Sequence, residues 1–173
     1  HLIRVRDLQI ETGGFTEFVP LPFVASESPV YLKGRARRGP SFREAVLMHA
    51  IARIVFHRYI SNIQTSWVKM GHKGVIACLD AGANDLGGTL MNESITRAAG
   101  AAHGQETNPS MMLDMISDAN RIPRPRTTIY NDLNSDRLDT ALEAGELSEI
   151  INSPAKKYER RGRRKLIRSS ANV

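Results

Sequence analysis

The sequence predicts an α/β fold in which parallel strands alternate with helices. Short apolar runs alternate along the chain with segments whose apolar residues have helical spacing. The connections are mostly short, and glycine follows several of the helical segments, as is common where helices end. Only three or four strands are expected. That is too few to close a barrel, so we expect an incomplete layer of parallel strands.

The first forty residues predict a helix, a strand and a long loop. Residues 2–11 have apolar positions spaced for one buried helix face, and Gly13 ends that helix. Residues 15–23 are mostly apolar and predict a buried strand that two prolines terminate. The loop over residues 24–40 carries four basic side chains, which either reach an anion or form a solvated surface.

A capping box at Ser41 and Glu44 predicts the start of the next helix, which we expect to run to about His57. This helix is apolar on most sides, so we expect it to be covered on more than one face. The following elements are predicted as strand 62–69, helix 71–80, strand 85–90, helix 92–99, helix 109–120 and strand 126–130.

We predict a domain over residues 1–130 and a polar, partly helical and flexible appendage over residues 131–173. The net charge of +6 arises in residues 156–168 of the appendage, where Glu159 alone stands against eight basic side chains and the segment carries +7. They are Lys156, Lys157, Arg160, Arg161, Arg163, Arg164, Lys165 and Arg168. A non-catalytic module that binds nucleic acid or an acidic partner through this tail is one alternative. We do not expect nucleic acid as the main partner, because charge runs are usually solvated.

Composition excludes several classes of protein. Cys78 is the only cysteine, so there is no internal disulfide and no cysteine cluster for zinc or iron–sulfur, and we expect a cytoplasmic location. No apolar run approaches the roughly 18 residues of a membrane span, so no membrane partner is expected. The chain begins with His1 and enters a helix at once, from which we expect a fragment of a longer protein.

Candidate site residues follow from the ends of the predicted strands. In parallel barrels the chemistry collects at the carboxyl ends of strands, here residues 17–20, 66–69 and 87–91. Alternation along strand 62–69 places Gln64 and Ser66 on its polar face, which we expect to face the interior. These side chains either bind a substrate or satisfy neighbouring backbone groups.

Two charged side chains need partners. Glu17 stands among apolar neighbours, so it pairs either with a substrate ammonium or hydroxyl group or with a cation such as Arg43. Lys69 either contacts a carboxylate or is exposed.

The turn after Gly82 supplies the remaining candidates. Asp85 is expected to fix the turn rather than to act in catalysis. Gly87 and Gly88 allow the backbone to approach a ligand closely, or form a bulge or a tightly packed strand. The predicted substrate-binding residues are Glu17, Gln64, Ser66, Lys69, Asp85, Gly87 and Gly88. No metal ligand and no catalytic residue is assigned.

Several sequence blocks resemble one enzyme family. They are residues 11–23 (Glu-Thr-Gly-Gly-Phe-Thr-Glu-Phe-Val-Pro-Leu-Pro-Phe), 34–40, 62–71, and 82–100 with Gly-Gly-Thr-Leu-Met at its centre. They occur in the right order and at compatible spacing over about residues 1–130. The chain resembles the radical S-adenosylmethionine enzymes that make the deazaflavin FO, in particular their tyrosine-using component, which some organisms carry as the C-terminal half of a fused enzyme.

The resemblance implies the C-terminal half of a partial TIM-type barrel. It also implies that a [4Fe-4S] cluster, held by a Cys-x3-Cys-x2-Cys loop, cleaves S-adenosylmethionine. The resulting radical attacks L-tyrosine, and a hydroxybenzyl fragment is joined to 5-amino-6-(D-ribitylamino)uracil. This chain lacks the cluster loop. Either an N-terminal half is missing, or the chain is not catalytic by itself.

Two further alternatives remain open. The menaquinone enzymes of the futalosine pathway share the Asn-Ile-Gln-x-Ser-Trp and Gly-Ala-Asn-Asp patterns, although Gly-Gly-Thr-Leu-Met and Phe-Val-Pro-Leu-Pro-Phe favour the deazaflavin enzyme. The chain could also be a structural part whose partner supplies the cluster half and covers its exposed strand edge.

Overall fold

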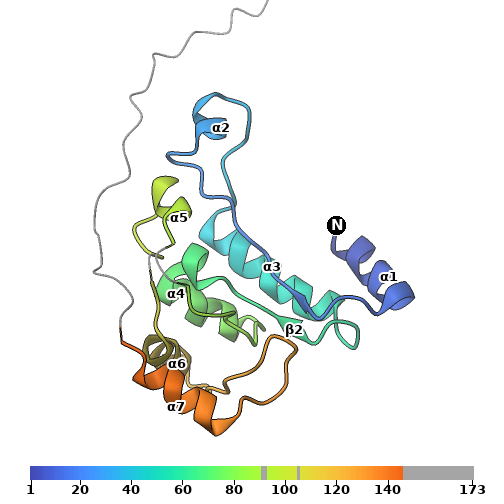
Figure 1. Cartoon of the computed structure of the whole chain (residues 1–173). Coiled ribbons are helices and arrows are strands. Elements are labelled where there is room, and N and C mark those ends of the chain that lie inside the picture. Colours follow the sequence, from blue (N-terminus) through green and yellow to red (C-terminus); the bar gives the residue numbers. More distant parts are fainter. Residues whose placement is uncertain (91–92, 105, 146–173) are drawn as a thin grey trace, which may run out of the picture.

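A computed structural model describes residues 1–90, 93–104 and 106–145 (Figure 1). Its elements in order are α1 (Leu2–Thr12), β1 (Glu17–Phe18), α2 (Pro29–Leu32), α3 (Phe42–Val55), β2 (Asn62–Ile63), α4 (Trp67–Asp80), α5 (Ile95–Ala98), α6 (Pro109–Asp118) and α7 (Ser135–Glu143).

The sheet is small and parallel. Glu17 of β1 lies opposite Asn62 of β2, and Phe18 lies opposite Ile63. One residue further along, Gln64 forms a parallel bridge to Asp85, so a third chain segment continues the layer. The predicted α/β class and the parallel pairing are therefore confirmed.

The predicted strands are much too long. Residues 15–23 form a strand only at Glu17–Phe18, because the prolines at positions 20 and 22 have no N–H to donate to a ladder. Leu21 is 64% exposed, so this run is not buried as predicted. The predicted strand 85–90 reduces to the single bridge at Asp85. The predicted strand 126–130 is wrong, because the chain turns there and Tyr130 has φ 63°.

The prediction fails midway through residues 62–69. The strand ends at Ile63, and Ser66 becomes the N-cap of α4, which begins at Trp67 rather than at Gly71. Gly71 instead marks a kink inside α4, where φ is 64° and the His103 ring lies against the glycine. A β-carbon at Gly71 would lie 3.2 Å from that ring, so the kink and the contact both favour glycine.

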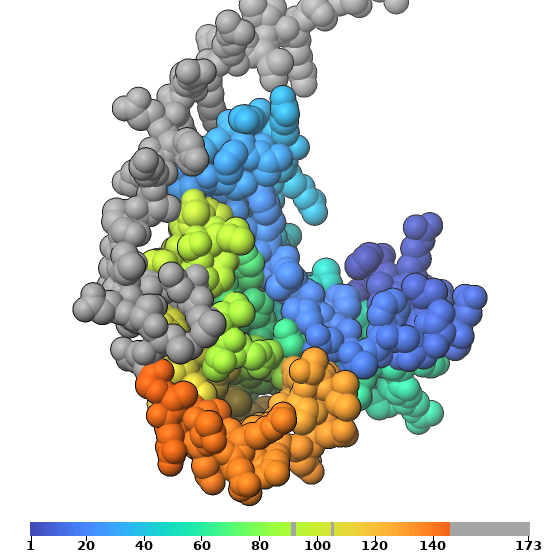
Figure 2. All heavy atoms as spheres, in the orientation of Figure 1, coloured from blue at the N-terminus to red at the C-terminus, as the bar shows by residue number. Residues whose placement is uncertain are grey.

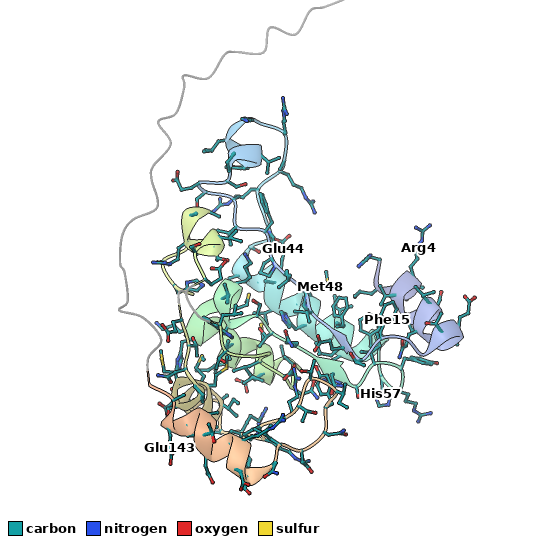
Figure 3. The ribbon with its side chains drawn as sticks, viewed as in Figure 1. Arg4, Phe15, Glu44, Met48, His57 and Glu143 are labelled. Carbon is teal, nitrogen blue, oxygen red and sulfur yellow. The ribbon has the colours of Figure 1, made fainter. Side chains whose placement is uncertain are left out.

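The helix termini were predicted best. Gly13 ends α1 in the left-handed conformation, with φ 62°. The capping box at the start of α3 is formed, since the Glu44 N–H donates to Ser41 Oγ and the Ser41 N–H donates to Glu44 Oε2. Figure 3 labels Glu44 at this end of the helix. Helix α6 ends two residues before the predicted position, and α5 is shorter than the predicted 92–99.

Two burial predictions hold only in part. Helix α3 packs against α1, α4 and β2, as expected for coverage on more than one face, but Leu47 is 50% and Ile54 76% exposed. Leu8 of α1 is 45% exposed, while Leu2 and Val5 pack against the core as predicted. The predicted loop 24–40 contains the short helix α2.

One apolar cluster lies between the strands and α3. Phe18 and Ile63 point towards α3, where they join Phe56, with the Phe18 and Phe56 rings 4.8 Å apart. A second apolar cluster joins α4 to α6 through residues that include Val75 and Met115. Because successive strand residues face opposite sides, Glu17 and Gln64 point away from the first cluster. Burial of Phe18 and Ile63 on one face of the strands therefore places the polar side chains on the opposite face.

Helix α7 packs against α6. A separation of the chain at residue 130 stays a prediction. Residues 146–173 of the predicted appendage, including the basic tail, lie outside the described residues. None of the helices that the structure describes is long and apolar enough to cross a membrane.

Replacing Ile63 by alanine is expected to destabilise the chain by about 2–5 kcal/mol, because Ile63 is fully buried and its removal leaves a cavity. The matched control is Ile54→Ala, since Ile54 is 76% exposed and its truncation is expected to cost less than about 1 kcal/mol. Denaturant unfolding of both variants measures the difference. Equal losses would contradict the described core.

Candidate functional site

A cavity of about 750 Å³ opens on the polar side of the parallel segments. Figure 2 shows the hollow, framed by the segment coloured orange. Its polar lining includes Glu17, Gln64, Asp85 and Arg126. Its apolar walls come mainly from α4, α6, α7 and the turns between them, including Leu79, Leu86, Met112, Leu113, Ile116, Ile122, Leu133, Leu138 and Leu142.

A two-point ion pair joins Arg126 to Asp85. The Arg126 Nε lies 2.8 Å from Asp85 Oδ1, and Arg126 Nη2 lies 2.6 Å from Asp85 Oδ2. The side chains are 24% and 10% exposed. The planar guanidinium matches the carboxylate geometry, which makes this the strongest contact in the site.

Glu17 is tied to the same group by two neutral donors. Gln64 Nε2 donates to Glu17 Oε2 at 3.1 Å and to Asp85 Oδ2 at 2.8 Å. The Tyr130 hydroxyl donates to Glu17 Oε2 and lies 3.0 Å from Asp85 Oδ2. We call Glu17, Gln64, Asp85, Arg126 and Tyr130 the carboxylate network.

The network fixes the protonation states of two of its members. Burial alone would raise the pKa of Asp85, but hydrogen bonds from Arg126 and Gln64 outweigh it and lower the pKa below its ordinary value. Burial, the bond to Glu17 and the charge on Asp85 raise the pKa of the Tyr130 phenol far above its usual value. Asp85 is therefore anionic and Tyr130 is a neutral donor near pH 7.

Tyr130 takes an unfavourable backbone conformation to reach the site. A φ of 63° costs a non-glycine residue about 1 kcal/mol or more. Its hydroxyl contacts and the Arg126 guanidinium, which lies 4.0 Å from the centre of its ring, offset that cost.

The structure brings five predicted residues together. All five line the cavity, although up to 71 positions separate them in the sequence: Glu17, Gln64, Asp85, Gly87 and Gly88. Glu17 pairs with Tyr130 and Gln64 rather than with Arg43.

The turn is fixed by Asn84, not by Asp85 as predicted. The Asn84 Oδ1 atom accepts the Ile63 N–H at 2.8 Å and Arg53 Nη2 at 2.6 Å. Asp85 is thereby free to face the cavity.

The two glycines have different environments. A β-carbon at Gly87, where φ is 77°, would lie 2.9 Å from Gln64 Oε1, so the close approach is to a neighbouring side chain. A β-carbon at Gly88 would meet nothing within 4 Å. The Gly88 carbonyl accepts the Trp67 indole N–H at 3.1 Å.

Ser66 and Lys69 lie away from the network because they belong to α4. Ser66 is the N-cap of that helix and makes no capping bond through its side chain. Lys69 Nζ donates to Thr96 Oγ1 at 2.6 Å, and neither Ser66 nor Lys69 lines the cavity. The predicted role of Lys69 with a carboxylate is not seen in this structure.

Sequence reasoning missed Arg126 and Tyr130 because residues 126–130 were predicted as a strand. The available signal was the pair of acids at Glu17 and Asp85. Two carboxylates on one face of adjacent strands require a cation, and the segment Arg124-Pro125-Arg126 offers one.

The residues present do not fit an iron–sulfur cluster. Cys78, the single cysteine, is fully buried, and burial raises the pKa of its thiol. Within residues 1–90, 93–104 and 106–145, no three His, Cys, Asp or Glu side chains could together hold a metal ion.

Comparison with known proteins places this geometry in a family. Residues 12–137 match the family described as the CofH/MqnC C-terminal region. The chain belongs to this family. The match contains the complete carboxylate network, from Glu17 to Tyr130.

Relatives in this family carry FO synthase names, which confirms the predicted relationship. The chain is 53% identical over 130 residues to FO synthase of Mycobacterium tuberculosis, covering 75% of this chain and 15% of that protein. It is 52% identical over 130 residues to the 5-amino-6-(D-ribitylamino)uracil–L-tyrosine 4-hydroxyphenyl transferase of Methanopyrus kandleri, covering 75% and 35%. It is 45% identical over 152 residues to FO synthase of Streptomyces coelicolor, covering 87% and 18%. The chain thus spans about a third or less of these relatives.

Asp85→Asn is expected to destabilise the chain by about 2 kcal/mol, since Arg126 loses a charged partner in a mostly desolvated position. The matched control is Asp132→Asn. Asp132 pairs with Arg124, but the two side chains are 72% and 78% exposed, so we expect less than about 1 kcal/mol. Urea unfolding at pH 7 measures both. Similar losses in the two variants would contradict a special role for the Arg126–Asp85 pair.

The stability contributed by Asp85 is expected to disappear in acid. Folding lowers the pKa of Asp85, so this contribution is present above the ordinary aspartate pKa near 4 and is lost as the pH falls through the lower folded value. The difference in unfolding free energy between the original chain and Asp85→Asn should therefore narrow below about pH 4. A difference that stays constant from pH 7 to pH 3 would rule this out.

Proposed function

We propose that this chain is the substrate-binding part of a radical S-adenosylmethionine enzyme of deazaflavin FO biosynthesis. The observation that carries the proposal is that the family match over residues 12–137 encloses the whole carboxylate network and most of the residues that line its cavity. The names of the relatives support FO synthesis, and one of them names both a ribitylaminouracil and L-tyrosine.

In this proposal the residues of the chain bind and orient small molecules. The cavity combines polar groups on one side with aliphatic walls on the other, as small-molecule sites commonly do. L-Tyrosine and 5-amino-6-(D-ribitylamino)uracil are the substrates proposed for it. Substrate-binding roles are part of the proposal for the residues that line the cavity, Glu17, Gln64, Asp85, Gly87 and Gly88. Ser66 and Lys69 do not line it, so no direct contact with the substrate is proposed for them.

The [4Fe-4S] cluster and S-adenosylmethionine belong to the proposed enzyme, but this chain's own residues do not fit the cluster. A Cys-x3-Cys-x2-Cys loop needs three cysteines, and the chain has one. We therefore propose that another segment or subunit holds the cluster and continues the parallel layer beside β1 towards a TIM-type barrel. A cytoplasmic location remains our prediction.

Reconstitution tests the proposal. The chain is produced together with a separately supplied segment that carries a Cys-x3-Cys-x2-Cys loop and a [4Fe-4S] cluster. The mixture receives S-adenosylmethionine, L-tyrosine and 5-amino-6-(D-ribitylamino)uracil. Mass spectrometry of a product that joins the hydroxybenzyl and uracil parts would support FO-type chemistry. Turnover of a futalosine-pathway substrate instead would assign the chain to the menaquinone branch.

Gln64→Leu is expected to lower kcat/KM of the reconstituted enzyme by about tenfold, since the side chain donates to both carboxylates and its loss leaves them short of a donor. Glu11→Leu on the exposed end of α1 is the control and should leave kcat/KM within about twofold. Unchanged kcat/KM in Gln64→Leu would show that the cavity is not the substrate site.

A further inference from the structure

The charged groups that line the cavity leave one carboxylate without a cation of its own. Arg124 pairs with Asp132 at 2.7 Å, and Arg121 pairs with Asp80 at 3.5 Å. These two ion pairs cancel in charge. They are exposed, so they contribute little to the field at the polar side of the cavity.

Arg126, the third arginine that lines the cavity, already pairs with Asp85. Arg126 Nη2 lies 2.6 Å from Asp85 Oδ2 but 3.8 Å from Glu17 Oε2. Because the energy of an ion pair falls with distance, Asp85 takes most of the compensation. The polar side of the cavity therefore keeps one formal negative charge, and it resides on Glu17.

The two oxygens of Glu17 differ in their contacts. Oε2 accepts hydrogen bonds from Tyr130 and Gln64, whereas no residue that the structure describes donates to Oε1. The Glu17 side chain is 36% exposed, against 10% for Asp85. Glu17 thus has free acceptor capacity at the cavity, while both oxygens of Asp85 are occupied.

The other walls of the cavity limit what kind of cation fits. The aliphatic side chains of Leu86, Met112 and Ile116 line it, together with others from α6 and α7. A hydrated metal ion or a polycation would gain nothing from such walls. A single ammonium group attached to an apolar body matches both the one free carboxylate and the apolar lining.

We propose that Glu17 binds the ammonium group of an amine substrate through Oε1, with the apolar part of that substrate against the aliphatic walls. Resting on the proposed function, this assigns Glu17 to the α-ammonium group of the aromatic amino acid. Towards this ammonium group the rest of the network has a positioning role. Gln64 and Tyr130 hold the Glu17 carboxylate through Oε2, while Asp85 and Arg126 anchor Gln64 and Tyr130.

Binding of two tyrosine-like probes to the chain tests the assignment. Tyramine keeps the ammonium group and lacks the carboxylate, whereas 3-(4-hydroxyphenyl)propionate keeps the carboxylate and lacks the ammonium group. Titrations followed by NMR should show tyramine binding at least about tenfold more tightly than the propionate. Glu17→Gln should weaken tyramine binding about tenfold. Glu11→Gln, the same change on the exposed end of α1, should leave it unchanged.

A second variant separates loss of charge from loss of fold. Glu17→Asp keeps the carboxylate and should retain a preference for tyramine over the propionate, while circular dichroism checks that both variants are folded. Equal binding of the two probes, no binding of tyramine up to about 10 mM (roughly −2.7 kcal/mol), or unchanged tyramine binding in Glu17→Gln would overturn the assignment.

The reconstituted enzyme distinguishes failure of this inference from failure of the proposed function. Product formation with an unchanged KM for tyrosine in Glu17→Gln would overturn the inference and leave the function standing. No product from the original chain, together with Glu17-dependent tyramine binding, would overturn the function and support the ammonium site.

Discussion

The ion pair between Arg126 and Asp85 holds the site together. It connects the segment after α6 to the parallel layer across 41 positions of sequence and so closes one side of the cavity. A carboxylate that is 10% exposed would be costly without a cation, and a two-point contact from a planar guanidinium is the geometry that compensates best. The same guanidinium stacks on Tyr130 and brings the phenol to Glu17. Loss of the pair would therefore affect three contacts at once. They are the ion pair itself, the stacking of Arg126 on Tyr130 and the hydrogen bond from Tyr130 to Glu17.

The apolar register of the strands decides where that pair can form. Phe18 and Ile63 are held in the cluster under α3, and alternation then turns Glu17 and Gln64 to the opposite face. A slip of one residue would place the carboxylate against Phe56 and expose an aromatic ring, so the buried cluster strongly disfavours it. Core packing and site geometry are thus set by adjacent residues of the same short strands.

The helix ends could be predicted from local sequence signals. The strands and the site could be predicted less well, because they depend on pairing between residues far apart in the sequence. The box at Ser41 and Glu44 and the stop at Gly13 depend on neighbours within a few positions, so the sequence was sufficient. Strand lengths were overestimated, since apolar content alone does not distinguish a strand from proline-bound loop or from the start of α4. Glu17 was found because a lone charged group in an apolar run is conspicuous, and Gln64 because alternation along the predicted strand placed it on the polar face. Arg126 was not, because nothing local selects it among 24 basic side chains.

In the proposed enzyme, substrate recognition and cluster chemistry need different residues. This chain has the residues proposed for recognition but not those that would hold the cluster. The carboxylate network is complete within residues 12–137, with each charge placed by contacts inside that region. A cluster would need several thiolates near an opening, whereas Cys78 is buried against His49, with Sγ 3.5 Å from Nδ1. The network is preorganised without any cluster ligand, because its bonds run between strands and turns of this chain alone. In the proposed enzyme, the affinity of the cavity for an amine can therefore be measured separately from the chemistry performed on that amine.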